Sequence, residues 1–267
     1  MKKNFNTLLN KTVLITGASS GLGEAIAYES VKKGADVILC ARRQSELERV
    51  TTNCRRISQS RVVSIVLDVS SYGSCQSLFA VLTRDNLRVD VLVNCAGFGV
   101  FENFIDTPRH TIDQMFQVNV LGLIHLTQQI ALLMIEQGTG HIINIASQAG
   151  KMATPKSSIY SATKFAIIGF SNSLRLELRD FGIAVTTVNP GPIKTNFFKI
   201  ADPKGNYLEK VGVLAISPES LAKKIVDSMG SYRREINVPM IMELGSKCYQ
   251  LFPVVGDALA RTVFNKK

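Results

Sequence analysis

The sequence has few of the residues that build metal sites or disulfide frameworks. Its 267 residues include no tryptophan, only three histidines and five cysteines. The cysteines are scattered, with no Cys-x-x-Cys pair and no paired histidines nearby, so we expect neither a zinc site nor disulfide bonds. This usage is typical of a reducing compartment. The histidines, His110, His125 and His141, are therefore interpreted as structural and not as ligands.

A secretory signal and a membrane span are not predicted either. The N-terminus, Met1-Lys-Lys-Asn-Phe-Asn, has no apolar h-region. Residues 114–135 contain no Asp, Glu, Lys or Arg, but they include Gln117, Asn119, His125 and further polar residues. That is too many polar groups for a lipid-facing helix, so we expect a helix packed between a sheet and another subunit. A cytoplasmic protein is predicted.

The net charge of +10 indicates an anionic partner. The basic residues are dispersed and no helix-turn-helix, zinc-finger or RNA-binding signature accompanies them, so nucleic acid is not expected. A phosphorylated cofactor or an anionic lipid surface explains the charge better. No Pro/Ser-rich or repetitive stretch suggests a linker, which favours one domain over residues 1–267.

Short β-branched runs alternate with amphipathic stretches, which is typical of a parallel sheet with helical crossovers. Seven strands are predicted, at Thr12–Thr16, Asp36–Cys40, Val62–Leu67, Val89–Asn94, His141–Ala146, Ala184–Asn189 and Glu235–Val238. Six helices are predicted, near Leu22–Lys33, Ser45–Ser58, Ser74–Asp85, Ile112–Glu136, Ile159–Asp180 and Pro218–Met229. The pattern predicts a doubly wound α/β domain with helices on both faces of the sheet. A cofactor half covers about residues 1–140 and a catalytic half about 141–267.

The first predicted strand runs into a glycine-rich loop that opens a helix. The loop reads Thr16-Gly17-Ala-Ser-Ser-Gly21-Leu-Gly23. Glycines let the backbone approach a pyrophosphate, which the helix N-terminal amides then hold. We expect cofactor contacts along this loop from Gly17, Ser19, Ser20, Gly21, Leu22 and Gly23.

The end of the second strand predicts the choice of cofactor. NAD sites usually place an Asp or Glu there for the ribose diol. This sequence has Arg42 and Arg43 instead, which favour the 2′-phosphate of NADP(H). The alternative is a solvated arginine pair at the start of a surface helix.

Further contacts are predicted where later strands end. Asp68 and Val69 follow the third strand, where the carboxylate can accept a hydrogen bond from the adenine amine. The turn with Asn94, Ala96 and Gly97 follows the fourth and leaves room for a ribose. The segment after the sixth offers backbone and a hydroxyl to the carboxamide, through Pro190, Gly191, Ile193 and Thr195.

Three side chains suit the reduction of a carbonyl group. Ser147 lies at the end of a predicted strand, and Tyr160 and Lys164 are four apart and share one face of a helix. Lowering the phenol pKa from about 10 by roughly 3 units takes about 4 kcal/mol, which one ammonium about 4 Å away can supply. A second Tyr-x-x-x-Lys, at Tyr28 and Lys32, has no strand-end serine before it and is interpreted as structural.

Taken together, these motifs resemble those of the short-chain dehydrogenase/reductase family, in its compact single-domain branch. The resemblance covers about residues 10–200 and rests on Thr-Gly-x-x-x-Gly-x-Gly at 16–23, Asn-Cys-Ala-Gly at 94–97, Asn119, Ser147, Tyr160-x-x-x-Lys164 and Pro190-Gly191. It implies a Rossmann-type fold and a catalytic tetrad. One departure is Cys95, where the family commonly has a second asparagine; we expect a structural adjustment with catalysis intact.

In the implied tetrad, Tyr160 is the general acid or base, Lys164 lowers its pKa and binds the nicotinamide ribose, and Ser147 holds the substrate oxygen. Both the tyrosine and lysine also bind cofactor. Asn119 would anchor a water that relays protons from Lys164. The alternative for Asn119 is a helix-interior amide bonded to a neighbouring carbonyl.

The resemblance and the residues predict an NADP(H)-dependent oxidoreductase acting on a carbonyl or secondary alcohol; the alternative is a non-catalytic NADP-binding sensor. The apolar segment 196–213, with Phe197, Phe198, Ile200 and Tyr207, is expected to cover a hydrophobic substrate. Excess apolar surface on segments 112–136 and 159–180 predicts a homodimer or homotetramer. The apolar tail, residues 238–267, either packs over the pocket or a subunit interface or lies on an anionic membrane.

Overall fold

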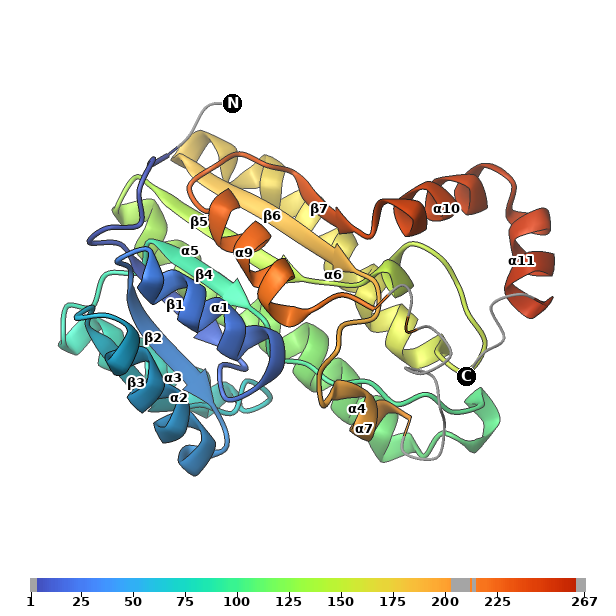
Figure 1. The fold of residues 1–267 in the computed structure, drawn as a ribbon, viewed down its shortest axis with the longest axis horizontal. Helices are drawn as coiled ribbons and strands as arrows, with labels where there is room; N and C mark the ends of the chain where they lie inside the picture. The colour runs from blue at the N-terminus through green and yellow to red at the C-terminus, as the bar shows by residue number, and fades with distance from the viewer. Residues whose placement is uncertain (1–3, 203–211, 213–214, 263–267) are drawn as a thin grey trace.

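Seven strands form one parallel sheet in the computed structural model, which describes residues 4–202, 212 and 215–262 (Figure 1). They are β1 (Thr12–Thr16), β2 (Asp36–Ala41), β3 (Val62–Val66), β4 (Val91–Asn94), β5 (Gly140–Ile145), β6 (Ile183–Pro190) and β7 (Glu235–Val238). Their order is β3-β2-β1-β4-β5-β6-β7. The β-branched and aliphatic side chains of the central strands are buried, as expected for a sheet covered on both faces. The predicted doubly wound, Rossmann-type fold is confirmed.

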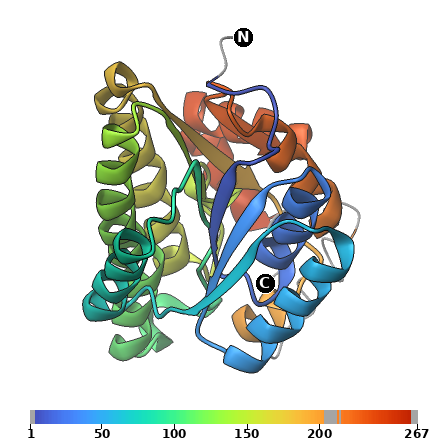
Figure 2. The same ribbon diagram turned by 90° about the vertical axis from the view of Figure 1, so that its left-hand side faces the viewer.

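Two helical layers cover the sheet (Figure 2). One contains α1 (Gly21–Lys32), α2 (Gln44–Ile57) and α9 (Pro218–Ser228), and the other contains α3 (Tyr72–Arg84), α5 (Leu123–Glu136) and α6 (Ser158–Glu177). The first layer packs through Ile26, Leu47 and Ile225, which belong to one apolar cluster with the sheet. Leu78 and Leu126 belong to the cluster on the opposite face. Each helix therefore buries one apolar stripe.

The long helix predicted at 112–136 is interrupted in the structure. It begins as α4 (Arg109–Phe116), passes through a π-helical turn (Gln117–Gly122) and continues as α5. By length and composition, residues 109–136 could cross a membrane. Leu126, Ile130 and Met134 are nevertheless fully buried, and α5 lies against β4, β5 and α3. The helix is thus part of the layer that covers the sheet.

The chain reverses its direction of winding between β1 and β4. Strands after β1 extend toward β3, and strands from β4 onward extend the other way. The loops at the carboxyl ends of β1 and β4 therefore diverge, which opens a crevice at this switch point. The glycine loop and the Asn94–Gly97 turn are at this edge of the sheet.

Several short elements were not predicted. The 3₁₀ turns are 104–106, 148–150 and 179–181, and α7 (Phe197–Ala201) follows β6. The tail forms α10 (Met240–Leu251) and α11 (Pro253–Thr262), which project from the end of β7 away from the sheet (Figure 1). Tyr207 and most of the predicted cover over 196–213 lie outside the described residues.

Candidate active site

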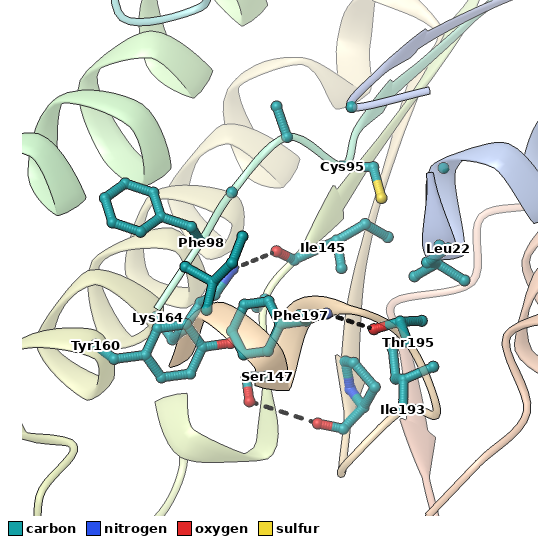
Figure 3. A pocket seen from close by; sticks show the side chains of 18 of the residues that line it. Leu22, Cys95, Phe98, Ile145, Ser147, Tyr160, Lys164, Ile193, Thr195 and Phe197 are labelled. Atoms are coloured by element: carbon teal, nitrogen blue, oxygen red, sulfur yellow. Dashed lines mark hydrogen bonds between the residues drawn. The ribbon is translucent and has the colours of Figure 1, made fainter. Parts of the chain in front are cut away.

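The three predicted catalytic side chains converge beyond the end of β5. Ser147 follows the strand by two residues, and Tyr160 and Lys164 extend from α6 into the same cavity (Figure 3). Both α6 side chains are buried. Lys164 Nζ donates to the carbonyl oxygen of Ile145 at 3.0 Å, which fixes the helix against the strand.

Burial perturbs the charge of Lys164. Loss of water lowers the pKa of its ammonium to about 8, and the neighbouring Cys95 thiol acts in the opposite direction. At neutral pH the ammonium is still the main form. Its Nζ lies 5.6 Å from the centre of the Tyr160 ring, so the ammonium also makes a cation–π contact with this side chain.

The Ser147 hydroxyl is held weakly. Its oxygen accepts a hydrogen bond from the Ala149 amide at 3.1 Å, while its own proton points at the Pro190 carbonyl from 3.5 Å. The second distance is at the long limit for a hydrogen bond. The proton can therefore be redirected to a substrate oxygen at little cost.

Asn119 is buried in the π-helical turn. Its Oδ1 accepts from the Phe98 amide at 3.0 Å, and its Nδ2 donates to the Phe98 carbonyl at 2.8 Å and to Thr163 Oγ1 at 3.2 Å. A Cβ on Gly97 would lie 3.0 Å from Asn119 Oδ1 and 3.9 Å from Lys164 Nζ. The side chain therefore holds the 97–98 segment beside Lys164, as in the alternative of a bonded interior amide. A water relay at this residue stays a prediction.

One cavity of about 660 Å³ contains most of the predicted site. The predicted residues that line it are Gly17, Ser19, Ser20, Gly21, Leu22, Gly23, Arg42, Arg43, Asp68, Val69, Ala96, Gly97, Ser147, Tyr160, Lys164, Pro190, Gly191, Ile193 and Thr195. Of the predicted residues, all of them in the described part of the chain, Asn94 and Asn119 are not among its lining. Asn94 instead donates to Thr127 Oγ1 at 2.8 Å and Asn144 Oδ1 at 2.9 Å, so it ties β4 to β5 and α5.

The glycine loop is tight enough to require glycine. A Cβ on Gly23 would lie 2.4 Å from the Gly17 carbonyl oxygen. Gly17 itself has a φ of +67°, and a Cβ there would lie 3.0 Å from the backbone of Ala96. The first turn of α1 therefore presents its amides to the cavity at close range, which suits a pyrophosphate.

Arg43 lies across this loop. Its Nη2 donates to Ser20 Oγ at 3.1 Å and to Ser19 Oγ at 3.3 Å. Arg42 also lines the cavity, and both arginine residues are exposed. The two guanidinium groups therefore give this end of the cavity a positive charge next to the hydroxyls that an anionic group would bind.

Thr16 holds the Asn94–Gly97 turn in place. Its Oγ1 accepts from the amides of Cys95 and Ala96, both at 3.0 Å. Burial raises the pKa of the Cys95 thiol to about 12, against a smaller effect of Lys164. The thiol stays protonated at neutral pH, so the departure from the family motif leaves no reactive thiolate beside Lys164.

The opposite end of the cavity is aromatic. Phe101 and Phe197 each lie 5.8 Å from the Tyr160 ring, centre to centre, and Phe198 lies 5.3 Å from Phe197. Figure 3 shows Phe197 next to the phenol of Tyr160. Phe197, Phe198 and Ile200 were predicted to cover the substrate, and all three line the cavity.

Sequence reasoning missed several lining residues, among them Phe98, Phe101, Met152, Ile241, Met242 and Gly245. Phe98 follows the Asn94–Gly97 turn directly and Phe101 comes three residues later, so their place after a predicted strand end was a signal for them. The last three come from α10. Packing of the apolar tail over the pocket is one of the predicted alternatives, but no helix was predicted from the spacing of its apolar residues.

The second Tyr-x-x-x-Lys pair is far from this chemistry. Tyr28 Oη donates to Glu24 Oε1 at 2.8 Å and accepts from Asn53 Nδ2 at 3.1 Å. Lys32 pairs with Glu29 at 2.6 Å on the exposed side of α1. This copy serves to join α1 and α2.

Comparisons with known proteins agree with the motifs. Residues 11–205 match the model of the short-chain dehydrogenase family, so the chain belongs to this family of oxidoreductases. Human dehydrogenase/reductase SDR family member 7 is 35% identical over 193 residues, 71% of this chain and 57% of the human protein. An uncharacterized oxidoreductase of Staphylococcus aureus strain N315 is 34% identical over 231 residues, 86% of this chain and 95% of that protein.

Among solved structures, a short-chain dehydrogenase from Sphingobium yanoikuyae in complex with NADPH has a TM-score of 0.79 at 25% identity and covers 92% of this chain and 96% of its own. Structures of similar fold contain NAD in some cases and NADPH in others. The family therefore uses a nicotinamide cofactor.

Proposed function

We propose that this protein is an NADP(H)-dependent reductase or dehydrogenase that transfers a hydride between the nicotinamide and the carbonyl or secondary alcohol of an apolar small molecule. One observation carries the proposal. The cavity that contains Ser147, Tyr160 and Lys164 also reaches Arg42 and Arg43 at one end and an aromatic cluster at the other.

The residues present suit such a cofactor. The loop from Gly17 to Gly23 would hold the pyrophosphate, since its close backbone packing leaves amides facing the cavity. Arg42 and Arg43 would bind the 2′-phosphate through charge-assisted hydrogen bonds. Asp68 would bind the adenine amine, because its Oδ1 accepts hydrogen bonds from the Ser70 amide and hydroxyl, which hold the carboxylate in place. We therefore propose NADP(H) over NAD(H).

The catalytic residues would then handle the proton. When bound, the nicotinamide supplies or accepts the hydride. Tyr160 gives its phenolic proton to the substrate oxygen in reduction and takes it back in oxidation. Ser147 donates a hydrogen bond to the same oxygen as negative charge develops there. Lys164 stabilises the phenolate and binds the nicotinamide ribose, and Asn119 keeps the neighbouring backbone against Lys164.

The substrate end favours an apolar molecule without charge. Phe101, Phe197, Phe198, Met152 and Met242 form this end. The charged residues among the described lining are Arg42, Arg43, Asp68 and Lys164, and they belong to the cofactor and catalytic parts. A carboxylate on the substrate would lose its hydration with no cation in the aromatic part to replace it. A ketone or aldehyde of steroid-like or acyl character fits better.

We also propose that the protein works in the cytoplasm as a homodimer or homotetramer, without nucleic acid. Leu121, Leu132, Phe165 and Leu176 are exposed on the layer formed by the 109–136 helix and α6. A second copy could cover them. The exposed apolar residues of α10 and α11 support contact with an anionic membrane surface, to which the net charge of +10 is complementary.

A panel of carbonyl compounds tests the function. Purified protein is mixed with NADPH or NADH, and cofactor oxidation is followed at 340 nm for neutral aromatic, aliphatic and carboxylated carbonyls. Turnover of neutral apolar compounds with NADPH is expected. Tight NADPH binding without turnover of any compound, matched by the Tyr160→Phe variant, would favour the sensor alternative.

A further inference from the structure

A largely buried lysine, Lys151, joins three elements close to the cavity, between the lining residues Ala149 and Met152. Lys151 Nζ lies 2.6 Å from Glu235 Oε2, 2.9 Å from Glu243 Oε2 and 3.1 Å from Asn237 Oδ1. The side chains of Lys151, Glu243 and Glu235 are only 11%, 15% and 20% exposed. An ammonium has three protons, and here each has an acceptor. The acceptors come from β7 and from α10.

On one side the lysine belongs to the turn that carries the catalytic serine. The 3₁₀ turn 148–150 begins after Ser147 and ends at Lys151, whose amide donates to the Gln148 carbonyl at 2.9 Å. The turn lies tightly on α6, because a Cβ on Gly150 would be 2.8 Å from the backbone of Lys164. The backbone immediately before Lys151 therefore packs directly against the backbone of Lys164.

On the other side the lysine holds α10. Glu243 is on this helix, next to Met242, and Ile241, Met242 and Gly245 line the cavity. Met242 packs on the Pro190-Gly191 turn, where a Cβ on Gly191 would be 2.6 Å from its sulfur. The helix packs against β7, the 148–150 turn and α11, while its outer residues Met240 and Leu244 are exposed. Few apolar contacts therefore hold α10 in its orientation relative to the sheet.

We propose that Lys151 is a positioning residue that sets α10 as one wall of the substrate site at a fixed distance from Ser147. Without its ammonium, Glu235 and Glu243 would be left with their carboxylates directed at the same point. Two partly buried like charges repel each other, and the repulsion would move the helix that has the weaker support, which is α10. This inference rests on the proposed function and adds the residue that determines fit for large substrates.

The test compares Lys151→Met with Lys247→Met. Lys247 Nζ lies 3.7 Å from the other oxygen of the same carboxylate, Glu243 Oε1, but its side chain is 66% exposed. The control therefore removes one positive charge beside Glu243 and leaves the hydrogen bonds of Lys151 in place. For Lys151→Met we expect KM for a large apolar carbonyl to rise about tenfold or more, with kcat within about threefold. KM for a small carbonyl that cannot reach α10, and Kd for NADPH, should stay the same. The control should match the wild type.

A second measurement does not depend on turnover. Amide hydrogen exchange of residues 240–251 should be faster in Lys151→Met than in Lys247→Met, with the exchange of α1 unchanged. Should Lys151→Met fail to fold, Glu243→Gln is the second variant, because it removes only the negative charge on α10. It should raise KM for large substrates and speed up exchange in α10 in the same way, but by less.

Unchanged exchange in α10 would overturn the proposal, as would a KM increase that is equal for small and large substrates or a loss confined to kcat. A wild-type protein that reduces no carbonyl would contradict the proposed function only, because the exchange experiment would still decide the role of Lys151.

Discussion

The ammonium of Lys164 donates to the carbonyl oxygen of Ile145 at 3.0 Å, two residues before Ser147. This bond ties α6, which carries Tyr160, to the strand end that carries the serine. The fold therefore brings the phenol, the ammonium and the hydroxyl into one cavity.

Tyr160→Phe should lower kcat by about two to four orders of magnitude, because it removes a positioned proton donor while leaving the ring contacts with Phe101 and Phe197. Steady-state rates on a substrate from the carbonyl panel measure this. Tyr28→Phe is the matched control, since Tyr28 belongs to the second Tyr-x-x-x-Lys and bonds only Glu24 and Asn53 among the contacts identified for it. Equal rates for wild type and Tyr160→Phe would refute the mechanism.

Lys164→Met should abolish activity and yet stabilise the cofactor-free protein at neutral pH. Burial lowers the pKa of Lys164 from 10.5 to about 8. The charged ammonium therefore destabilises the folded state relative to the unfolded chain, in which it is hydrated. At pH 7 the cost is on the order of 1 to 3 kcal/mol, after allowing for the lost bond to Ile145.

The sign of the pH dependence follows from this shift. Between pH 8 and 10.5 the unfolded chain binds more protons than the folded one at this site, so wild-type stability gains relative to the variant as the pH rises. Urea unfolding of both proteins at pH 7 and pH 10 measures the difference. A difference in unfolding free energy that is constant over this range would show that Lys164 is not strained by burial.

Much of this site could be predicted because strand ends in a parallel sheet meet at one edge. The glycine loop, Arg42 and Arg43, Ser147 and the Tyr160–Lys164 pair all follow predicted strands or share a helix face, and all line the cavity. Asn94 could not be placed in this way, because its partners Thr127 and Asn144 are 33 and 50 residues away. Lys151 was not predicted for the same reason. Its hydrogen-bond acceptors come from β7 and α10, and no pattern in the sequence around Lys151 indicates them.

Charge reversal at Arg42 and Arg43 should change cofactor preference. The double variant Arg42→Glu/Arg43→Glu should raise Kd for NADPH at least tenfold more than Kd for NADH, because only NADPH carries the 2′-phosphate. Calorimetric titration of both cofactors measures this. Arg55→Glu/Arg56→Glu, at the far end of α2, reverses the same number of charges away from the cavity and serves as the control. Tighter binding of NADH than NADPH by the wild type would show that the arginines were misinterpreted.

The oligomeric state should depend on the helical layer with the exposed apolar residues. Light scattering at micromolar concentration is expected to give the mass of a dimer or tetramer of the 29.2 kDa chain. Leu132→Glu/Leu176→Glu places charges on exposed positions of α5 and α6 and should shift the mass toward the monomer. A wild-type monomer, or an oligomer that the double substitution leaves intact, would contradict this assignment.

The tail should bring the protein to anionic bilayers. Leu244, Leu251 and Val254 are among the exposed apolar residues of α10 and α11, and burying each in a bilayer interface contributes about 1 kcal/mol or more. The wild type should therefore co-sediment with vesicles of phosphatidylcholine and phosphatidylglycerol. Replacing these three residues by serine should weaken binding at least tenfold.

A control triple substitution to serine at Leu9, Ile57 and Val66 removes three other exposed apolar residues from outside the tail and should bind as the wild type does. Pure phosphatidylcholine vesicles should bind less, because the net charge of +10 no longer meets an opposite charge. If the tail variant binds vesicles as well as the wild type but changes mass in light scattering, the tail covers a subunit interface and the membrane assignment is wrong.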